Sequence, residues 1–349
     1  MPAARPTLDT VAAEAGVSRM TVSNAYNRPD QLSAATRQLV LDAARRVGYP
    51  GPDPTGASLR LRRTGTVGVV LTERLPYAFT DPGMVEILHG LATELSEAHM
   101  SLLLVPESGS ADGSLLRHAM VDALVLCSLP ADDPAVLAAQ QRQVPLVVVG
   151  APRLARVPVV GVDNFATAGM AARYLQSLGH TRFAVLTAGA SGPGRMRPGF
   201  QDRPNGFQHA LVDVDASNVV VYAASGHTRG AGAEAIAEML RMPASTRPTA
   251  LFAVTDVLAL GAIDAAHAQG VDVPGELSII GLDDIGEAAT SQPALTTLRQ
   301  DLFEQGRIAA RLAIRQIAGD AVRAPRMRAE LIIRNSTAPP GHRAVSPTR

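Results

Sequence analysis

Residues Thr7–Asn27 read TLDTVAAEAGVSRMTVSNAYN and carry the signals of two short helices joined by a tight turn. Thr7 is placed to cap a first helix, in which apolar residues recur at helical spacing until Gly16 ends the run. Ser18 is placed to cap a second helix that begins at Arg19. An apolar first helix, a glycine at the turn and a capped second helix with a polar outward face are the requirements of a helix-turn-helix motif. The stretch therefore predicts that motif.

The chain continues with a third helix and then a linker. Ser33 is placed to cap a helix over 34–47, and Gly48 is placed to end it. Residues 49–56 contain three prolines and two glycines, a composition typical of a linker. Residues 57–63 have weak helix potential, so we expect a helix there only when another surface holds it.

The whole chain has 349 residues, 46% hydrophobic and 18% charged, which excludes an intrinsically disordered protein. Its formal net charge is zero, but residues 1–64 carry nine arginines against five acids, a net +4, so the remainder is −4. A basic head on an acidic body favours a nucleic-acid partner, although four surface charges also occur on an ordinary solvated face.

Export and membrane insertion are not indicated. The single cysteine, Cys127, has no partner for an internal disulfide, and the first residues lack the apolar run of a signal peptide. No apolar stretch approaches the roughly 18 residues of a membrane helix. We expect a cytoplasmic protein with no membrane partner.

From residue 66 onward, short continuous apolar runs alternate with helical stretches, a pattern typical of doubly wound parallel sheets. The predicted strands are 67–71, 101–105, 123–126, 146–149, 159–162, 183–187, 219–222, 250–253 and 277–281. The predicted helices are 82–98, 133–143, 167–178, 206–212, 230–241, 256–269 and 302–318. So many strands predict two similar α/β lobes rather than one.

The headpiece pattern resembles the LacI/GalR family of bacterial transcriptional repressors. The residues that carry the resemblance are Val11-Ala12, Ala15-Gly16-Val17-Ser18, Thr21-Val22-Ser23, Asn27, Ser33, Thr36, Arg37 and Gly48-Tyr49. Two positions depart from the family pattern: Thr10 replaces the usual acid, with Asp9 just before it, and Tyr26 replaces the usual leucine. The resemblance continues through Val160-Gly161-Val162-Asp163-Asn164 and Gly281-Leu282-Asp283-Asp284 to about residue 337.

The resemblance implies an N-terminal three-helix helix-turn-helix headpiece followed by a core of two lobes, similar to periplasmic sugar-binding proteins. The boundaries it implies are a headpiece over 1–50, a linker and hinge helix over 51–65, an effector-binding and dimerisation core over 66–338, and a disordered tail over 339–349. Within the core, lobe 1 would span about 66–162 and 294–326, and lobe 2 about 163–293 and 327–338.

By the same resemblance, Arg19, Met20 and Asn24 would read base edges. Arginine pairs well with guanine and asparagine with adenine, and methionine can pack on a thymine methyl group. Arg19 as a phosphate contact is the alternative. Phosphate contacts are expected from Thr7, Thr21, Ser23, Asn27, Ser33 and Thr36. For each hydroxyl, a helix cap is the alternative role.

The hinge helix of the family inserts a leucine into the minor groove and kinks a base step. Ser58 and Leu59 match that pattern, so Leu59 is the expected wedge, with an ordinary interface residue as the alternative. Gly56 and Ala57 depart from the residues common in relatives.

The implied effector site lies in the cleft between the lobes. Arg203 and Asp283 are the main candidates, because an arginine and a carboxylate can grip polar groups with charge-assisted hydrogen bonds. A helix cap is the alternative for Asp283, and simple lining or core packing for two of the further candidates, His227 and Cys127. The remaining candidates are Thr255 and, from a first-lobe loop that departs from the family, Tyr77, Phe79 and Asp81.

We therefore expect a homodimeric repressor that binds a palindromic double-stranded DNA operator and responds to a small effector, a sugar or related metabolite. The chain lacks lysine and so lacks a lysine-containing phosphate loop, and its histidines show no metal-ligand spacing. We expect no enzyme, no metal and no cofactor. The alternative is a sugar-binding protein without regulatory DNA binding, against which residues 7–49 argue.

Overall fold

The computed structural model describes residues 6–52, 63–71, 75–106, 114–188 and 198–341. The chain divides into two compact units, Met1–Thr64 and Gly65–Arg349, which are described separately below. None of the helices in the described ranges is both long and apolar enough to cross a lipid bilayer.

The first unit contains the three predicted helices. They are α1 (Leu8–Ala15), α2 (Arg19–Asn27) and α3 (Ala34–Val47), with a short 3-10 turn η1 (Pro29–Gln31) before α3. Val11, Val22 and Val40 are fully buried where the helices meet. Gly16 and Gly48 follow α1 and α3 with φ of 65° and 69°, a backbone conformation that glycine adopts without strain.

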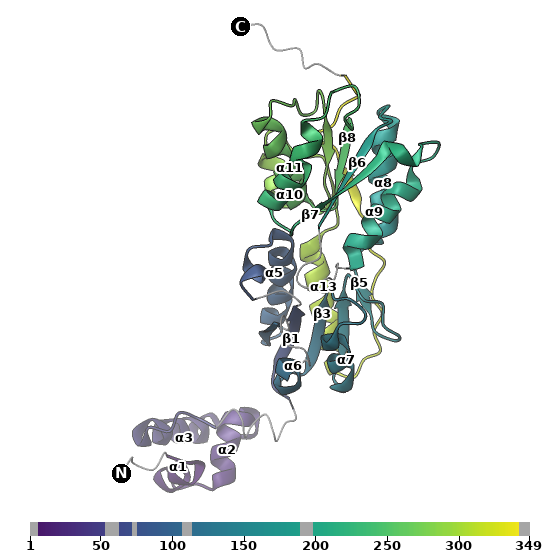
Figure 1. The fold of residues 1–349 in the computed structure, drawn as a ribbon. Helices are drawn as coiled ribbons and strands as arrows, with labels where there is room; N and C mark the ends of the chain where they lie inside the picture. Colours follow the sequence, from purple (N-terminus) through teal and green to yellow (C-terminus); the bar gives the residue numbers. More distant parts are fainter. Residues whose placement is uncertain (1–5, 53–62, 72–74, 107–113, 189–197, 342–349) are drawn as a thin grey trace, which may run out of the picture. The chain divides into compact units, whose positions relative to one another are not determined.

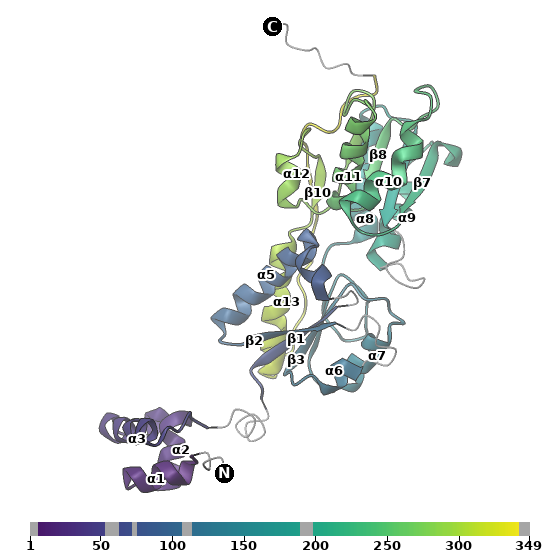
Figure 2. The ribbon, with the colours of Figure 1, turned by 60° about the vertical axis from the view of Figure 1, so that its left-hand side comes forward.

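The second unit contains two parallel sheets, as the apolar runs predicted (Figures 1 and 2). The first sheet has the order β2-β1-β3-β4-β5, and its strands are β1 (Thr66–Leu71), β2 (Ser101–Pro106), β3 (Ala123–Cys127), β4 (Leu146–Val149) and β5 (Val159–Val160). Its two faces are covered by α5 (Pro82–Glu97) with α13 (Leu302–Ile317), and by α6 (Ser114–His118) with α7 (Pro134–Gln141). A 3-10 turn, η2 (Leu75–Phe79), precedes α5.

The second sheet has the order β7-β6-β8-β9, and its strands are β6 (Phe183–Ala188), β7 (Val219–Ala224), β8 (Ala250–Ala253) and β9 (Ser278–Ile280). It lies between α8 (Asn164–Ser177) with α9 (Pro198–Ala210) and α10 (Arg229–Leu240) with α11 (Asp256–Ala268), as Figure 1 shows. The remaining elements are η3 (Ala216–Asn218), α12 (Gly286–Thr290) and an antiparallel pair, β10 (Thr297–Arg299) with β11 (Glu330–Ile332).

Several boundaries differ from the predicted ones. Helix α9 begins at Pro198 rather than at 206 and tolerates an internal proline, Pro204, which lacks an N–H donor. Strand β5 ends at Val160 rather than at 162, since Gly161, with a φ of 148°, turns the chain out of the sheet. The short elements α6, α12, β10 and β11 were not predicted.

Three segments connect the two sheets. They follow β5, join β10 to α13, and join α13 to β11. Leu295 and Leu298 still belong to the hydrophobic cluster of the second sheet, whereas Ala309 and Ala310 belong to that of the first. The second of these crossings therefore lies between 298 and 309, directly at the start of α13.

Helices α5 and α13 pack in very close contact through two glycines. A Cβ atom at Gly306 would lie 2.1 Å from the carbonyl oxygen of Ile87, and one at Gly90 would lie 2.0 Å from the carbonyl oxygen of Phe303. Both positions exclude any side chain. This packing sets the start of α13, where the second crossing enters the first lobe.

We predict that Gly306→Ala lowers the free energy of unfolding by about 1–3 kcal/mol, because the helices must separate to admit the methyl group. Gly230→Ala is the matched control, since a Cβ at this other helical glycine meets no atom within 4 Å. It should stay within about 1 kcal/mol of the wild type. Urea unfolding measures both, and equal losses would contradict the packing argument.

Candidate functional site

The N-terminal end of α2 presents exposed side chains. The side chain of Arg19 is 68% exposed and Met20 is 73% exposed, while Val22 and Ala25 are buried against the other helices. Asn24 lies one turn later and is partly buried. The expected base-reading residues thus lie on a helix whose opposite side forms the core of the unit.

Most of the expected phosphate contacts take part in local hydrogen bonds. Thr7 Oγ1 accepts from the Thr10 amide at 3.3 Å, and Ser33 Oγ accepts from the Thr36 amide at 3.1 Å. Thr21 donates its amide N–H to Ser18 Oγ at 3.0 Å, and Asn27 Nδ2 donates to the Ser23 carbonyl at 2.8 Å. Thr7 and Ser33 therefore cap α1 and α3. The backbone amides of Thr21 and Thr36 are bonded by the capping hydroxyls of Ser18 and Ser33.

Two hinge candidates, Ser58 and Leu59, lie outside the described residues. Of the first-lobe candidates, Tyr77 is described only as part of the η2 backbone.

A cavity of about 70 Å³ lies between the two sheets of the core. Its walls come from the ends of first-lobe strands, from two of the crossing segments and from α5, α8, α9 and α13. The lining residues are Ile87, Ser128, Val149, Gly150, Ala151, Gly161, Val162, Asn164, Arg203, Gln300, Leu302 and Gln305. Arg203 is the expected effector residue among them.

Arg203 is 7% exposed, and its guanidinium is held by several groups at once. Its Nε donates to Asn164 Oδ1 at 2.9 Å and its Nη1 donates to the Val254 carbonyl at 2.5 Å. Nη1 also lies 3.8 Å from Asp283 Oδ1. The two strongest sequence candidates, Arg203 and Asp283, are therefore neighbours.

Two glutamines extend this polar network. Gln300 Nε2 donates to Asp283 Oδ1 at 2.6 Å, and Gln305 Nε2 donates to the Gln300 carbonyl at 2.7 Å. Both glutamines are buried, with exposures of 7% and 2%. The network therefore joins α9 of the second lobe to α13 of the first.

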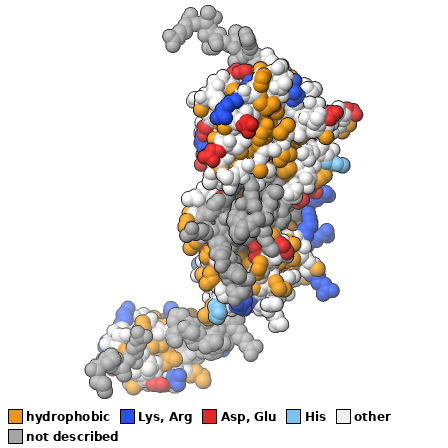
Figure 3. Space-filling model, viewed as in Figure 1, with side chains coloured by type: hydrophobic (Ala, Val, Ile, Leu, Met, Phe, Trp, Pro, Cys, Tyr) orange, Lys and Arg blue, Asp and Glu red, His pale blue; other side chains and the backbone are white. Residues whose placement is uncertain are grey.

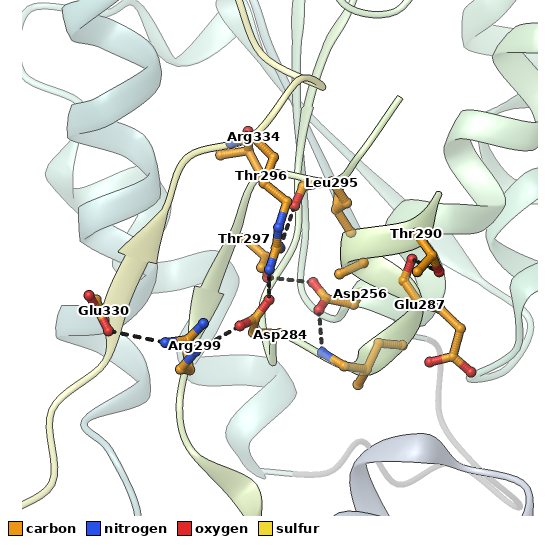
Figure 4. Close-up of polar contacts among 12 residues, drawn as sticks. Asp256, Asp284, Glu287, Thr290, Leu295, Thr296, Thr297, Arg299, Glu330 and Arg334 are labelled. Atoms are coloured by element: carbon orange, nitrogen blue, oxygen red, sulfur yellow. Dashed lines mark hydrogen bonds and ion pairs between the residues drawn. The ribbon is translucent and has the colours of Figure 1, made fainter. Parts of the chain in front are cut away.

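A second buried acid lies close to Asp283. Burial, followed by the nearby Asp283 carboxylate, raises the pKa of Asp256 to about 8. Burial also raises the pKa of Asp283, to about 6, while Arg203 and Gln300 oppose this rise. Asp256 accepts from the Thr297 hydroxyl at 2.5 Å and from the Ile285 amide at 3.0 Å (Figure 4). Asp256 therefore orders the loop that carries Asp283.

The next residue, Asp284, faces two arginines instead of the cavity. Figure 4 shows its carboxylate between Arg299 and Arg334, each at 2.7 Å. Arg299 also lies 3.5 Å from Glu330, on the neighbouring strand β11. These ion pairs tie the loop after β9 to both strands of the antiparallel pair.

A polar contact joins the two lobes beside the cavity. His227 Nδ1 lies 3.8 Å from Asp81 Oδ2, with side-chain exposures of 5% and 7%. His227 Nε2 lies 2.8 Å from Thr255 Oγ1, and Asp81 Oδ1 accepts from the Gly83 amide and so caps α5. Three of the expected effector residues are therefore in contact with one another across the cleft.

Two of the expected effector residues do not line the cavity and do not belong to the polar contacts around it. Cys127 is buried in the hydrophobic cluster of the first sheet, and the next residue, Ser128, lines the cavity instead. Phe79 is 64% exposed and does not line that cavity. Sequence reasoning missed Asn164, Gln300 and Gln305. Asn164 begins α8, Gln300 precedes α13 and Gln305 lies within it. Their amide side chains were the only available signal, because no local pattern shows that these segments meet.

Comparisons with known proteins agree with both units. The family model of bacterial regulatory proteins, lacI family, matches residues 7–51. A periplasmic binding protein-like domain matches residues 172–337.

Similar proteins match nearly the whole chain. A helix-turn-helix transcriptional regulator of Mycolicibacterium smegmatis is 39% identical over 335 residues, which cover 89% of this chain and 90% of that protein. The transcriptional repressor CytR of Escherichia coli is 34% identical and covers 95% and 96%. The structure of a transcriptional regulator CelR–cellobiose complex is 32% identical, with a TM-score of 0.68 and coverage of 95% and 100%.

We predict that Asp81→Asn lowers the free energy of unfolding by about 1–3 kcal/mol, because the charge that faces His227 is lost while the amide oxygen still caps α5. Asp133→Asn is the matched control, since Asp133 caps α7 in the same way, before a proline, with the Ala135 amide at 2.9 Å. It should change the free energy by less than about 0.5 kcal/mol. Equal effects of the two substitutions in urea unfolding would mean that the Asp81–His227 contact contributes nothing to the free energy of unfolding.

Proposed function

The chain belongs to the lacI family of bacterial regulatory proteins and is a DNA-binding transcriptional regulator, and we propose that it represses transcription from a palindromic operator under the control of a small effector. The observation that carries the proposal is the capped, outward-facing start of α2, where Arg19 and Met20 are exposed. The proposal takes the domain boundaries expected above: headpiece 1–50, hinge 51–65, core 66–338 and tail 339–349. Residues 1–5, 53–62, 72–74, 107–113, 189–197 and 342–349 lie outside the described residues.

DNA contact is assigned to the headpiece. A recognition helix enters the major groove with its N-terminal residues against the base edges, which is where Arg19 and Met20 lie on α2. Figure 3 shows charged side chains of both signs mixed on the visible face of the second lobe, with no single basic patch there. A homodimer is proposed because one such helix reads a half-site, and two helices related by a two-fold axis read a palindrome.

The core is assigned to effector binding. The cavity combines polar side chains, Arg203, Asn164 and Gln300, with apolar walls such as Ile87 and Leu302, and Asp283 lies behind it, 3.8 Å from Arg203. This combination suits a sugar or related metabolite. The related CelR structure contains cellobiose, which supports this class of ligand. Effector binding would change how the lobes close, and would release or promote DNA binding according to which lobe arrangement fits the operator.

The proposal includes no enzymatic activity and no cofactor, and it keeps the cytoplasm as the site of action, where the chromosome lies. Within the described residues, no group of three or more His, Cys, Asp or Glu side chains is placed to hold a metal ion. The alternative of a sugar-binding protein without regulatory DNA binding does not account for the lacI-family match over 7–51.

We predict that Arg19→Ala reduces discrimination at one symmetric pair of operator positions by about 5- to 150-fold, because a bidentate contact to a base is lost. Binding to a panel of single-substitution operators, followed by fluorescence anisotropy, measures this effect. A uniform loss over all sequences would make Arg19 a phosphate contact.

Residues 66–349 alone should show no specific binding to the operator. An affinity and salt slope equal to those of the full chain would refute the headpiece assignment.

We predict that a sugar, polyol, nucleobase or nucleoside raises the melting temperature of the full chain, and that Arg203→Ala abolishes this rise. Arg247→Ala is the control, because Arg247 is another buried arginine of the second lobe, at 6% exposure, and bonds the Leu240 carbonyl and Glu276 away from the cavity. Both variants should lose stability, and only Arg203→Ala should lose the ligand response. A normal response in Arg203→Ala would exclude it from the effector site.

A further inference from the structure

An ion pair connects α1 to the exposed start of α2. Arg19 Nε lies 3.6 Å from Asp9 Oδ1, and the two side chains are 68% and 67% exposed. Among the residues that the structure describes, the Asp9 carboxylate is the only polar group that the Arg19 side chain meets. The candidate base reader therefore has one acidic partner, and that partner lies on the same exposed surface.

The local structure of α1 explains why Asp9 is available for this contact. Thr7 and Thr10 form a reciprocal capping box, in which the Thr7 amide donates to Thr10 Oγ1 at 3.1 Å and the Thr10 amide donates to Thr7 Oγ1 at 3.3 Å. Thr10 thus supplies the acceptor that an acid commonly supplies at this position. Asp9 is not used in the cap, and its carboxylate reaches α2 instead.

Two other ion pairs of the headpiece have a different character. Arg46 pairs with Glu14 at 2.8 Å and holds α3 against α1, and Arg45 pairs with Asp42 within α3. Neither pair contains an expected base reader. The Asp9–Arg19 pair is distinguished by its place at the start of the recognition helix.

We propose that Asp9 is a positioning residue that holds the Arg19 guanidinium for one guanine in each half-site and so raises sequence selectivity. This inference rests on the proposed function. Guanine O6 and N7 accept two parallel N–H bonds from arginine, which requires a defined orientation of the guanidinium plane. A carboxylate beside Nε restricts that orientation before binding, so less side-chain entropy is lost in the complex.

The charge of Asp9 acts in the same direction. A carboxylate at the interface repels phosphates and therefore weakens binding to every sequence alike. It also competes with phosphates for Arg19, whereas a guanine can accept from the two Nη groups while the Asp9 contact at Nε stays in place. The ratio of specific to random binding rises as a result.

The test selects operators from a randomised palindromic library with the full chain and with four variants, Arg19→Ala, Asp9→Asn, Asp9→Glu and Asp42→Asn. Asp42→Asn is the matched control, because it removes the same charge from an exposed headpiece ion pair away from α2. The wild type should prefer guanine at the position where Arg19→Ala loses discrimination. Asp9→Asn should reduce that preference by about two- to fivefold, the range expected for an exposed ion pair.

Asp9→Glu should restore the preference for guanine, and Asp42→Asn should keep it unchanged, although both Asn variants should bind random DNA more tightly. A structural role for Asp9 alone would weaken all operator positions equally, and that result overturns the inference. The inference is also overturned if Arg19→Ala abolishes the guanine preference but Asp9→Asn keeps it at the wild-type level. The proposed function stands in that case. Failure of the wild type to select any sequence would instead refute the proposed function.

Discussion

A buried guanidinium must be paired, and the pairing of Arg203 determines how the core is assembled around its cavity. Arg203 comes from α9 of the second lobe, and its partners come from the start of α8 (Asn164), from the residue after β8 (Val254) and from the loop after β9 (Asp283). Gln300, at the second crossing, then bonds Asp283. The Gln300–Asp283 hydrogen bond therefore links this buried network of the second lobe to the crossing that enters α13.

The two consecutive acids after β9 have different partners. Asp283 and Asp284 both have positive φ, 137° and 62°, a conformation that turns their side chains to different partners. Asp283 contacts Arg203 and Gln300, whereas Asp284 binds Arg299 on β10 and Arg334 just after β11 (Figure 4). The network around Arg203 and the ion pairs of Asp284 thus meet in one short loop. Asp256 and the two arginines hold this strained backbone from both sides.

Local signals predicted much of this molecule, and long-range pairings account for what they missed. Helix caps such as Ser18 and Ser33 and buried apolar runs are short patterns, so the headpiece and both sheets could be predicted. Strands β10 and β11 have three residues each and pair Thr297 with Ile332, which no local pattern records. The cavity shows the same limit. Arg203 and Asp283 were identified through the family resemblance, but Gln300 and Gln305 were not. Cys127, the last residue of β3, packs into the core of the first lobe, and Ser128, which follows the strand with a φ of 51°, lines the cavity instead.

The headpiece shows how one displaced residue changes the role of an acid. Successive residues of an α-helix are rotated by about 100° around its axis, because a turn takes 3.6 residues. An acid at position 10 would turn back to the amide of the helix cap, the bond that Thr10 makes to Thr7. At position 9 the same carboxylate turns toward α2 and reaches Arg19 instead. The departure from the family pattern at positions 9 and 10 therefore leaves the helix cap intact. It also adds a charge contact to the recognition helix, so the two residues act as a pair.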